Sequence, residues 1–168
     1  MGRLENLLGV QALAVVDRIA ASDAASSEDA ALVTLLTHPD RGVGWLAGVV
    51  GLTDSGATRL VERLVDAGLV RRRAGADARS RTLRLTAPGR RRAERVLAAR
   101  ERELEGCLEA LSPTEQRTLE RLLDKLVASL TDDRSTALRC CRLCDRDACV
   151  SGRVGCPLRH TVPPGGLP

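Results

Sequence analysis

The spacing of apolar residues is helical along most of the chain and changes to alternation in one short central stretch. Apolar side chains that recur every three or four residues lie on one face of an α-helix. They predict helices over about residues 3–21, 28–38, 43–50, 53–68, 87–111 and 113–130. Alternation replaces this period after Gly68, so the fold is predicted to be mainly α with a small β element.

Polar residues that begin helices support three of these boundaries. Thr53 and Thr86 each precede a helical stretch, where a hydroxyl accepts a hydrogen bond from a free backbone N–H of the first turn. Ser112 and Glu115 have the spacing of a capping box, with Pro113 at the first helical position. The helices are therefore predicted to start at these residues.

The alternating stretch predicts a two-stranded ribbon. LVRRR (69–73) and TLRLT (82–86) have the composition of short strands. The segment AGADARS (74–80) between them contains Gly and Asp, which are typical of turns. A basic ribbon of this kind is the wing of a winged helix.

The residues before the ribbon match a helix-turn-helix. Ala47, Gly51 and Leu60 stand where that motif needs a small residue at the helix crossing, a turn glycine and a buried aliphatic side chain. The pattern is weak alone, but a basic ribbon follows it directly. The predicted fold is thus a winged helix-turn-helix over about residues 42–87, with flanking dimerisation helices.

Composition narrows the class of protein. The chain has 168 residues, enough for one domain, and it contains no Phe or Tyr and one Trp, so Leu, Val and Ala must form the core. It has no run of about 18 apolar residues, and Met1 is not followed by a signal-peptide pattern. We expect a cytoplasmic protein with no membrane partner.

The net charge of +4 is concentrated in one segment. Between Arg41 and Arg95 there are 13 arginines and five acidic residues, whereas the rest of the chain has 13 basic and 17 acidic residues. A basic patch is typical of proteins that bind a polyanion, because neutralised phosphates release their counterions. The alternative is that these arginine side chains are only solvated. Charge alone does not decide between the two, so polyanion binding needs the support of a motif.

The segment from Leu52 to Gly89 resembles the DNA-binding core of the MarR family of regulators. That family couples a recognition helix with the pattern T/S-x-S-x-x-S/T-R-L-V to a wing with Asp-x-Arg-x-Arg/Lys, followed by Leu-Thr-x-x-Gly. The matching residues are Thr53, Thr58, Arg59, Leu60, Asp77, Arg79, Arg81, Leu85, Thr86 and Gly89. With its flanking helices the resemblance covers about residues 3–130. Gly56 and Trp45 depart from the family pattern, so no operator sequence is carried over.

The resemblance implies a homodimeric transcription regulator that binds double-stranded DNA, with residues 1–132 as the winged-helix domain. Helices at 3–21 and 88–130 would form the dimer, and their wide apolar stripes independently support this. The residues expected to contact DNA are Thr53, Ser55, Thr58, Arg59, Arg63, Arg79 and Arg81. Family members often act as repressors released by a small molecule or by thiol oxidation. We expect a repressor, although an activator stays open and no residue identifies a small-molecule effector.

Structural roles are the alternative for these DNA-contact residues. Arg59 and Arg63 could pair with acidic neighbours on a solvated helix face, and Arg79 could be an idle loop residue. Their places opposite the apolar face and at the ribbon tip favour contact with bases, phosphates or the minor groove. His38 and His160 have no ligand or triad context, so neither has a predicted role.

Five of the six cysteines lie in the C-terminal tail, residues 133–168. Four of them have the spacing Cys-x2-Cys-x4-Cys-x6-Cys: Cys141, Cys144, Cys149 and Cys156. In a reducing cytosol, clustered cysteines favour metal binding or redox chemistry over structural disulfides. We predict that the loop 141–156 wraps one metal centre with these four thiolates. Cys140 is not one of the four predicted ligands, and Cys107 is predicted to be a small buried side chain.

The chemistry of this predicted site has three alternatives. The short spacing is similar to zinc knuckles, whereas Pro157 directly after the last cysteine is similar to ferredoxin-type loops. We favour an iron–sulfur cluster over zinc, because a tail beyond a dimerisation helix has little need of a structural staple but could report redox or iron status to the wings. A disulfide switch or reactive thiols are the third alternative. Arg142, Arg146 and Arg153 could offset the thiolate charge.

Two other classes of function compete with a DNA-binding regulator. An enzyme is disfavoured, because Cys141-x-x-Cys144 lacks the strand–helix context of a thiol oxidoreductase. A metal or redox binding module could instead use the helices as a dimeric scaffold without operator binding. Arg79 and Arg81 in the predicted wing disfavour that alternative.

Overall fold

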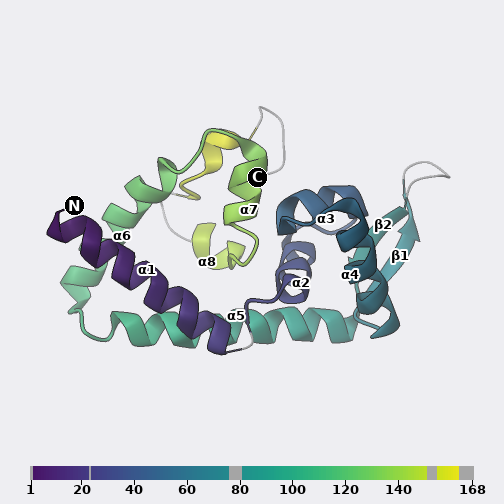
Figure 1. The fold of residues 1–168 in the computed structure, drawn as a ribbon, viewed down its shortest axis with the longest axis horizontal. Coiled ribbons are helices and arrows are strands. Elements are labelled where there is room, and N and C mark those ends of the chain that lie inside the picture. Colours follow the sequence, from purple (N-terminus) through teal and green to yellow (C-terminus); the bar gives the residue numbers. More distant parts are fainter. Residues whose placement is uncertain (1, 23, 76–80, 151–154, 163–168) are drawn as a thin grey trace.

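The computed structural model describes residues 2–22, 24–75, 81–150 and 155–162, and Figure 1 shows its arrangement. The elements in chain order are α1 (Arg3–Ala21), α2 (Ser27–Thr37), α3 (Val43–Val50), α4 (Asp54–Asp66), β1 (Val70–Ala74), β2 (Arg81–Leu85), α5 (Ala87–Leu108), α6 (Pro113–Ala128), α7 (Arg134–Cys140), α8 (Arg146–Val150) and the 3-10 turn η1 (Arg159–Thr161). The predicted fold class, mainly α with a small β-wing, is confirmed. Within the described ranges, no helix combines the length and apolar character needed to cross a membrane.

Side-chain caps begin the helices where the sequence predicts them. The hydroxyls of Thr53 and Thr86 each accept a hydrogen bond, at 3.1 Å, from the backbone N–H three residues on. Ser112 and Glu115 form the capping box, in which each side chain accepts from the other's backbone N–H. These bonds satisfy N–H groups that have no partner within the helix. The predicted starts of α4, α5 and α6 are confirmed.

β1 and β2 form the predicted antiparallel ribbon. Their register pairs Val70 with Leu85. Leu83 of β2 is fully buried in the core, and its backbone also pairs with that of Arg41. The base of the ribbon is therefore fixed to the segment that precedes α3, while the tip, residues 76–80, lies outside the described ranges.

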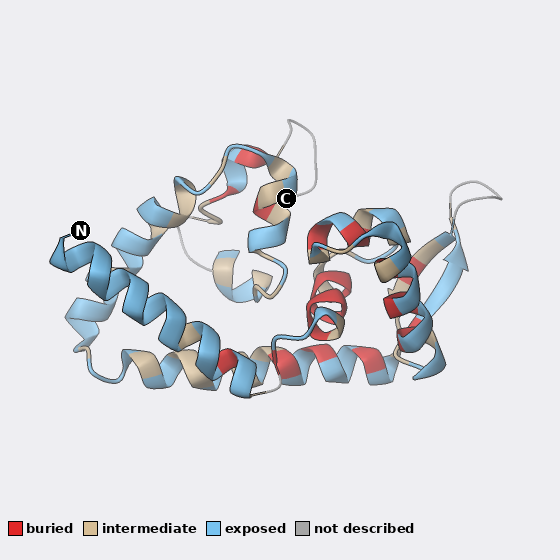
Figure 2. Ribbon diagram, in the orientation of Figure 1, coloured by how far each residue is buried: buried red, intermediate tan, exposed pale blue. Residues whose placement is uncertain are grey.

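The hydrophobic core lies between α2, α3, α4, the ribbon and the first half of α5, the segments with the most buried residues in Figure 2. Its largest fully buried side chains are Leu32, Leu35, Leu46, Leu60, Leu64, Leu83, Val33 and Val61. As predicted from the lack of Phe and Tyr, aliphatic side chains supply this core. It fixes α4 and the ribbon side by side at one end of the molecule.

α1 and α6 leave wide apolar faces uncovered. On α1, Leu4 is 76% exposed and Leu13 is 68% exposed; on α6, Leu126 is 51% exposed and Leu130 is 59% exposed. Among the described residues of these two helices, Ile19 alone is buried, and both helices are exposed over most of their length in Figure 2. Contiguous apolar faces of this kind are typical of surfaces that another chain covers.

The tail folds back against the helix-turn-helix instead of extending away from α6. α7 packs on α3, Ala137 of α7 is buried, and Leu143 packs against the hydrophobic core. Figure 1 shows α7 and α8 between α6 and the α2–α3 pair. The predicted metal loop thus lies beside the helix-turn-helix.

Candidate functional site

α4 is amphipathic, and the core orients its two faces. The buried face consists of Ala57, Leu60, Val61 and Leu64. The exposed face contains Ser55, Thr58, Arg59, Glu62 and Arg63. The DNA-contact residues predicted on this helix therefore point to solvent together, and the cap residue Thr53 lies at their N-terminal end.

Local hydrogen bonds orient the hydroxyl groups at the start of α4. The hydroxyls of Thr53 and Ser55 are 3.3 Å apart, and the Thr58 hydroxyl donates to the Asp54 carbonyl at 2.8 Å. All four residues are exposed. Because a helix N-terminus carries free N–H groups and a partial positive charge, this end of α4 is suited to a phosphate.

Arg63 is held by an ion pair on the exposed face of the molecule. Its Nε lies 2.8 Å from Oε1 of Glu28 on α2, and the two side chains are 60% and 43% exposed. An exposed pair of this kind contributes little free energy and is screened by salt. Arg63 can therefore exchange Glu28 for another anion at small cost.

The ribbon has an arginine-covered face that the motif did not single out. Asp40 and three of the strand arginines, Arg71, Arg73 and Arg84, line a shallow hollow on it. Arg71 and Arg84 are register partners, and Arg73 is two residues further along the same face. Arg84 Nε donates to Asp40 Oδ1 at 3.1 Å. Of the predicted wing residues, Arg81 is exposed at the start of β2, whereas Asp77 and Arg79 lie outside the described residues. Arg71 and Arg73 are two residues apart in LVRRR, which is the spacing that places side chains on one face of a strand, and this signal could have identified them.

The tail and the end of α2 enclose a pocket of about 80 Å³, which we call the cysteine pocket. Its lining includes Cys141, Cys144, Cys149, Cys156, Thr37 and His38. The structure thus brings the four predicted metal ligands to one place. Among the described residues, however, no three His, Cys, Asp or Glu side chains are already arranged to hold a metal ion. Metal binding would require the thiols to draw closer together.

The thiols of the pocket change one another's ionisation. A hydrogen bond with Cys144 lowers the pKa of Cys141 to about 7. The same hydrogen bond, together with burial, raises the pKa of Cys144 far above its ordinary value. Burial, and then the charge of Cys156, raise the pKa of Cys149. Cys141 therefore ionises more readily than Cys144 and Cys149, and the thiolate is the form that binds a metal.

Three arginines of the tail bring positive charge to the pocket. They are Arg134 of α7, Arg146 of α8 and Arg159 of η1. Of the predicted charge partners, Arg146 lies here, Arg142 donates to the Arg139 carbonyl at 2.8 Å, and Arg153 lies outside the described residues. The other two arginines lie outside the cysteine loop, where the spacing of the cysteines gave no signal.

His38 lies between the cysteine pocket and the helix-turn-helix. Its ring packs edge-to-face on Trp45 of α3, with centroids 5.5 Å apart, and the Arg41 guanidinium lies 5.1 Å from the centroid of the Trp45 ring. Burial, together with the nearby charges of Arg146, Arg134 and Arg41, lowers the pKa of His38 to about 4. The sequence assigned no role to this residue, because its contact with the pocket depends on the fold of the tail.

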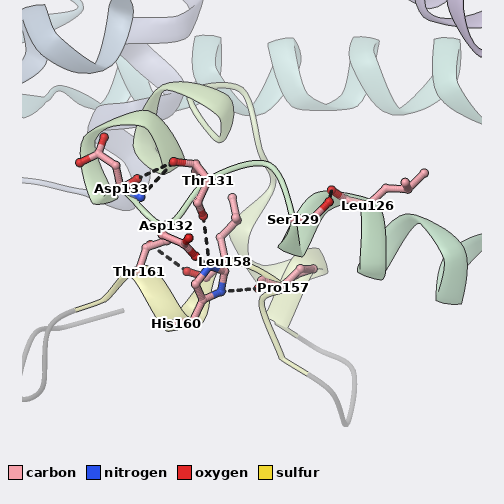
Figure 3. A network of polar contacts seen from close by, with 9 residues as sticks. All are labelled: Leu126, Ser129, Thr131, Asp132, Asp133, Pro157, Leu158, His160 and Thr161. Carbon is pink, nitrogen blue, oxygen red and sulfur yellow. Dashed lines mark hydrogen bonds and ion pairs between the residues drawn. The ribbon is translucent and has the colours of Figure 1, made fainter.

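His160 fixes the far end of the tail, as Figure 3 shows. One ring nitrogen lies 3.1 Å from the Thr131 carbonyl and 3.4 Å from the Asp132 carboxylate. The other lies 3.2 Å from the Pro157 carbonyl. His160 thus ties the turn after Cys156 to the linker between α6 and α7, which holds Cys156 at the pocket.

The two remaining cysteines do not line the cysteine pocket. Cys140 is exposed and Cys107 is half-buried, so Cys107 is less buried than its helical spacing predicted. The Cys107 thiol donates to the Glu103 carbonyl at 3.3 Å and accepts from Arg18 at 3.7 Å. None of the six cysteines, all within the described ranges, forms a disulfide.

Comparison with solved structures gives close matches to this architecture. A MarR family protein from Bacillus stearothermophilus is 34% identical, over 73% of this chain and 89% of that one, with a TM-score of 0.65. The Mycobacterium tuberculosis MarR family protein Rv2887 in complex with DNA is 25% identical, over 75% of this chain and 98% of that one, with a TM-score of 0.61. The same protein in complex with salicylic acid is 27% identical, with coverages of 75% and 97% and a TM-score of 0.59. No family model and no curated protein matches the chain.

An exposed polar helix beside a basic ribbon, both fixed by one aliphatic core, defines a winged helix-turn-helix protein. The chain belongs to the MarR family, since it shares 34% identity with a family member over most of the length of both chains. The resemblance drawn from the recognition-helix and wing motifs is confirmed.

Proposed function

We propose that this protein is a DNA-binding transcription regulator that acts as a homodimer. The observation that carries the proposal is the exposed polar face of α4 beside the arginine-covered ribbon at one end of the molecule (Figure 1). Membership of the MarR family supports it, and Rv2887 of that family has been solved in complex with DNA. A helix that one core holds at a fixed angle to a basic ribbon suits a major groove and its flanking backbone.

The contacts follow from the chemistry of the exposed groups. α4 lies in the major groove, where Arg59 and Arg63 reach guanine edges or phosphates. The hydroxyl groups at its N-terminal end contact the backbone: Thr53, Ser55 and Thr58. Arg79 and Arg81 in the wing contact phosphates or the minor groove.

A second copy of the chain is the partner that covers α1 and α6. α1 and α6 carry exposed leucines, and the two helices lie at the end of the molecule remote from the ribbon (Figures 1 and 2). A two-fold axis through this end turns the two recognition helices toward the same side of the DNA. The half-sites are then about one helical turn apart, and the operator is a pseudo-palindrome.

We infer that the regulator is a repressor whose signal enters through the tail. The cysteine pocket supports metal or redox sensing, because the four spaced thiols converge there with three arginines. A four-cysteine metal centre is the form we favour, with an iron–sulfur cluster ahead of zinc.

The convergence of the four thiols also supports a second candidate, a metal or redox module that uses a dimeric helical scaffold and binds no operator. The two functions make opposite predictions for one experiment. The purified protein is titrated with the DNA upstream of its own gene at several salt concentrations, and bound metal is measured in the same sample.

The regulator is expected to bind with an affinity that falls steeply with salt. Arg59→Ala should weaken binding and reduce the salt slope by about one if it removes one phosphate contact. Arg102→Ala, at an exposed position in the second half of α5, is the matched control and should bind like the wild type. Metal binding without DNA binding selects the module, and unchanged binding by Arg59→Ala excludes Arg59 from the interface.

A further inference from the structure

A four-residue segment, His38–Arg41, joins the cysteine pocket to the wing. At its first residue, His38 lines the pocket. At its other end the Asp40 N–H donates to the Leu83 carbonyl at 3.0 Å, and the Leu83 N–H donates to the Arg41 carbonyl at 2.9 Å. The Asp40 carboxylate also pairs with Arg84 on the same strand. The segment therefore connects the tail directly to the base of β2.

This segment has little freedom to absorb a displacement. Pro39 fixes its own φ, and Asp40 has a φ of +61°, in the small left-handed region. His38 packs on Trp45 of α3 and Arg41 lies over the same ring. A movement of His38 is thus passed to α3 and β2 instead of being lost in a flexible loop.

On the pocket side, the first two thiols are fixed to the body of the molecule. Between them in the chain, the Arg142 carbonyl accepts from the Thr34 hydroxyl of α2 at 3.3 Å, and the Leu143 carbonyl accepts from Arg100 of α5 at 3.1 Å. Leu143 also packs against the hydrophobic core. When a metal binds, Cys149 of α8 and Cys156 must therefore move toward Cys141 and Cys144.

We propose that the cysteine pocket binds a soft metal centre through the thiolates of Cys141, Cys144, Cys149 and Cys156, and that its occupancy sets the position of the wing through His38–Arg41. The proposal rests on the function proposed above for the winged helix. Four thiolates are the ligand set of zinc and of iron–sulfur clusters, and each thiol releases its proton to solvent as it binds.

The pocket has the charge and the space for such a centre. Arg134, Arg146 and Arg159 in its lining offset the negative charge of the thiolates. Its volume is about 80 Å³, which exceeds the roughly 10–15 Å³ that one water needs. The space therefore accepts a metal ion.

Occupancy changes the wing only through contacts that differ between the empty and filled pocket. In the structure the four thiols do not form a metal-binding group, so Cys149 of α8 must approach the other thiols when a metal binds, and Arg146 of the same helix moves with it. His38 shares the pocket with Arg146, and the charge of that arginine acts on the His38 ring. The metal-free and metal-bound proteins therefore differ in the surroundings of His38, the first residue of the segment that leads to the wing.

The fluorescence of Trp45 reports whether metal binding in the pocket alters the contact between His38 and α3. The signal is specific, because Trp45 is the only tryptophan and the chain has no tyrosine. Reduced, metal-free protein is titrated with zinc, which has no redox chemistry and no d–d absorption of its own. The Trp45 emission is expected to shift until about one zinc is bound per chain, to return on chelation, and to stay unchanged in Cys144→Ser. Zinc binding with unchanged emission overturns the link through His38.

Anaerobic reconstitution with iron and sulfide distinguishes an iron–sulfur cluster from a zinc centre. A coloured protein with acid-labile sulfide identifies the cluster, and retention of zinc alone identifies a zinc centre; both support a soft metal site. If the wild-type chain binds neither the cluster nor zinc, the proposed metal site is overturned. Neither measurement involves DNA.

The effect of metal binding on the wing is tested by measuring the affinity of the full-length protein for its operator. Metal-loaded and metal-free wild type are expected to differ in affinity by about fivefold or more. Pro39→Gly, at an exposed position, loosens the segment and should keep full metal content while the difference falls below about twofold. Pro113→Gly, the same substitution at the start of α6, is the matched control and should keep the fivefold difference.

The outcomes separate this inference from the proposed function. Equal affinities of the loaded and metal-free wild type overturn the coupling, and a Pro39→Gly protein that keeps the full difference overturns the path through the segment. Absence of all operator binding overturns the proposed function, while the Trp45 titration still decides whether the pocket acts on the helix-turn-helix.

Discussion

The Asp29 carboxylate of α2 accepts a hydrogen bond from the Arg92 guanidinium of α5 at 3.1 Å, although Asp29 is only 1% exposed. Its second oxygen accepts from the Ser26 hydroxyl at 2.6 Å. The pair joins α2 to α5, the long helix that runs toward α1 and α6 (Figure 1). A buried carboxylate is tolerated here because both of its oxygens are bonded.

Asp29→Ala is expected to lower the free energy of unfolding by about 2–3 kcal/mol, because it removes these bonds from a buried site. The loss stays below that of a fully buried pair since the Arg92 side chain is 45% exposed. Urea unfolding at neutral pH measures it. Glu28→Ala removes the neighbouring acid from an exposed pair and should cost less than about 1 kcal/mol. Equal losses in the two variants would contradict a structural role for the Asp29–Arg92 pair.

A second prediction concerns the first turn of α5. A Cβ on Gly89 would clash with the Leu69 backbone carbonyl, so Gly89→Ala must push α5 away from the ribbon. We expect a loss of about 2–4 kcal/mol in the free energy of unfolding. Gly48→Ala in α3 is the matched control, since nothing lies within 4 Å of the added Cβ; it should stabilise by about 0.5–1 kcal/mol. A Gly89→Ala protein as stable as the wild type contradicts this contact.

The sequence predicted those features that depend on neighbouring residues. Thr53, Thr86 and Ser112 start helices because each hydroxyl satisfies a backbone N–H three residues on. The amphipathic pattern of α4 likewise separates its buried face from the exposed one that carries Arg59. Such features need no knowledge of the rest of the fold, which explains why the winged helix could be predicted closely.

Features that depend on packing between distant segments were not predictable. His38 reaches the cysteine pocket only because the tail folds back on α2, and the hydrophobic pattern gives no signal for that return. Arg134 and Arg159 join the pocket for the same reason. Asp29 occurs in the sequence as an ordinary acidic residue of a first helical turn, and its burial becomes evident only with α5 in place.

A third prediction uses the pH dependence of the cap on α6. Hydrogen bonds from the Ser112 hydroxyl and N–H hold the pKa of Glu115 below its ordinary value of 4.5. The unfolded chain therefore takes up this proton more readily than the folded one. The contribution of Glu115 to stability is complete above pH about 4.5 and is lost as the pH falls through the lower folded pKa.

Glu115→Gln keeps a side-chain oxygen at this cap but does not titrate. The melting temperature of the wild type should exceed that of Glu115→Gln at neutral pH, and the difference should narrow in acid. Thermal unfolding of both proteins from pH 7 to pH 3 measures it. The same narrowing in Glu120→Gln, elsewhere on α6, would show that the cap is not its cause.

A fourth prediction addresses the apolar face of α6. Leu126 is 51% exposed in the single chain, and the proposed dimer covers it. Leu126→Glu replaces a buried leucine, worth about 1.5–3 kcal/mol, in both copies at once. Association should weaken by about 100-fold or more, which sedimentation equilibrium would measure. Arg121→Glu places the same side chain on the opposite face of α6, with a larger change of charge, and should leave the dimer intact. Equal effects of the two substitutions would contradict this face as the interface.

The last prediction concerns the competition for Arg63. In the free protein its guanidinium pairs with Glu28 at 2.8 Å, and in the proposed complex it contacts DNA. Glu28→Gln removes a negative charge next to the interface and a competitor for Arg63, so DNA affinity should rise by about two- to fivefold, mostly at low salt. Glu5→Gln on α1, remote from α4, should have no effect.

Arg63→Ala completes a double-mutant cycle on this pair. It should lower DNA affinity and reduce the salt slope by about one. Glu28→Gln should raise affinity less in the Arg63→Ala background, because part of its effect comes from freeing Arg63. Binding is measured by fluorescence anisotropy over a range of salt concentrations. A lower affinity in Glu28→Gln alone would mean that Glu28 holds Arg63 in its DNA-binding position, and competition between Glu28 and DNA would then be wrong.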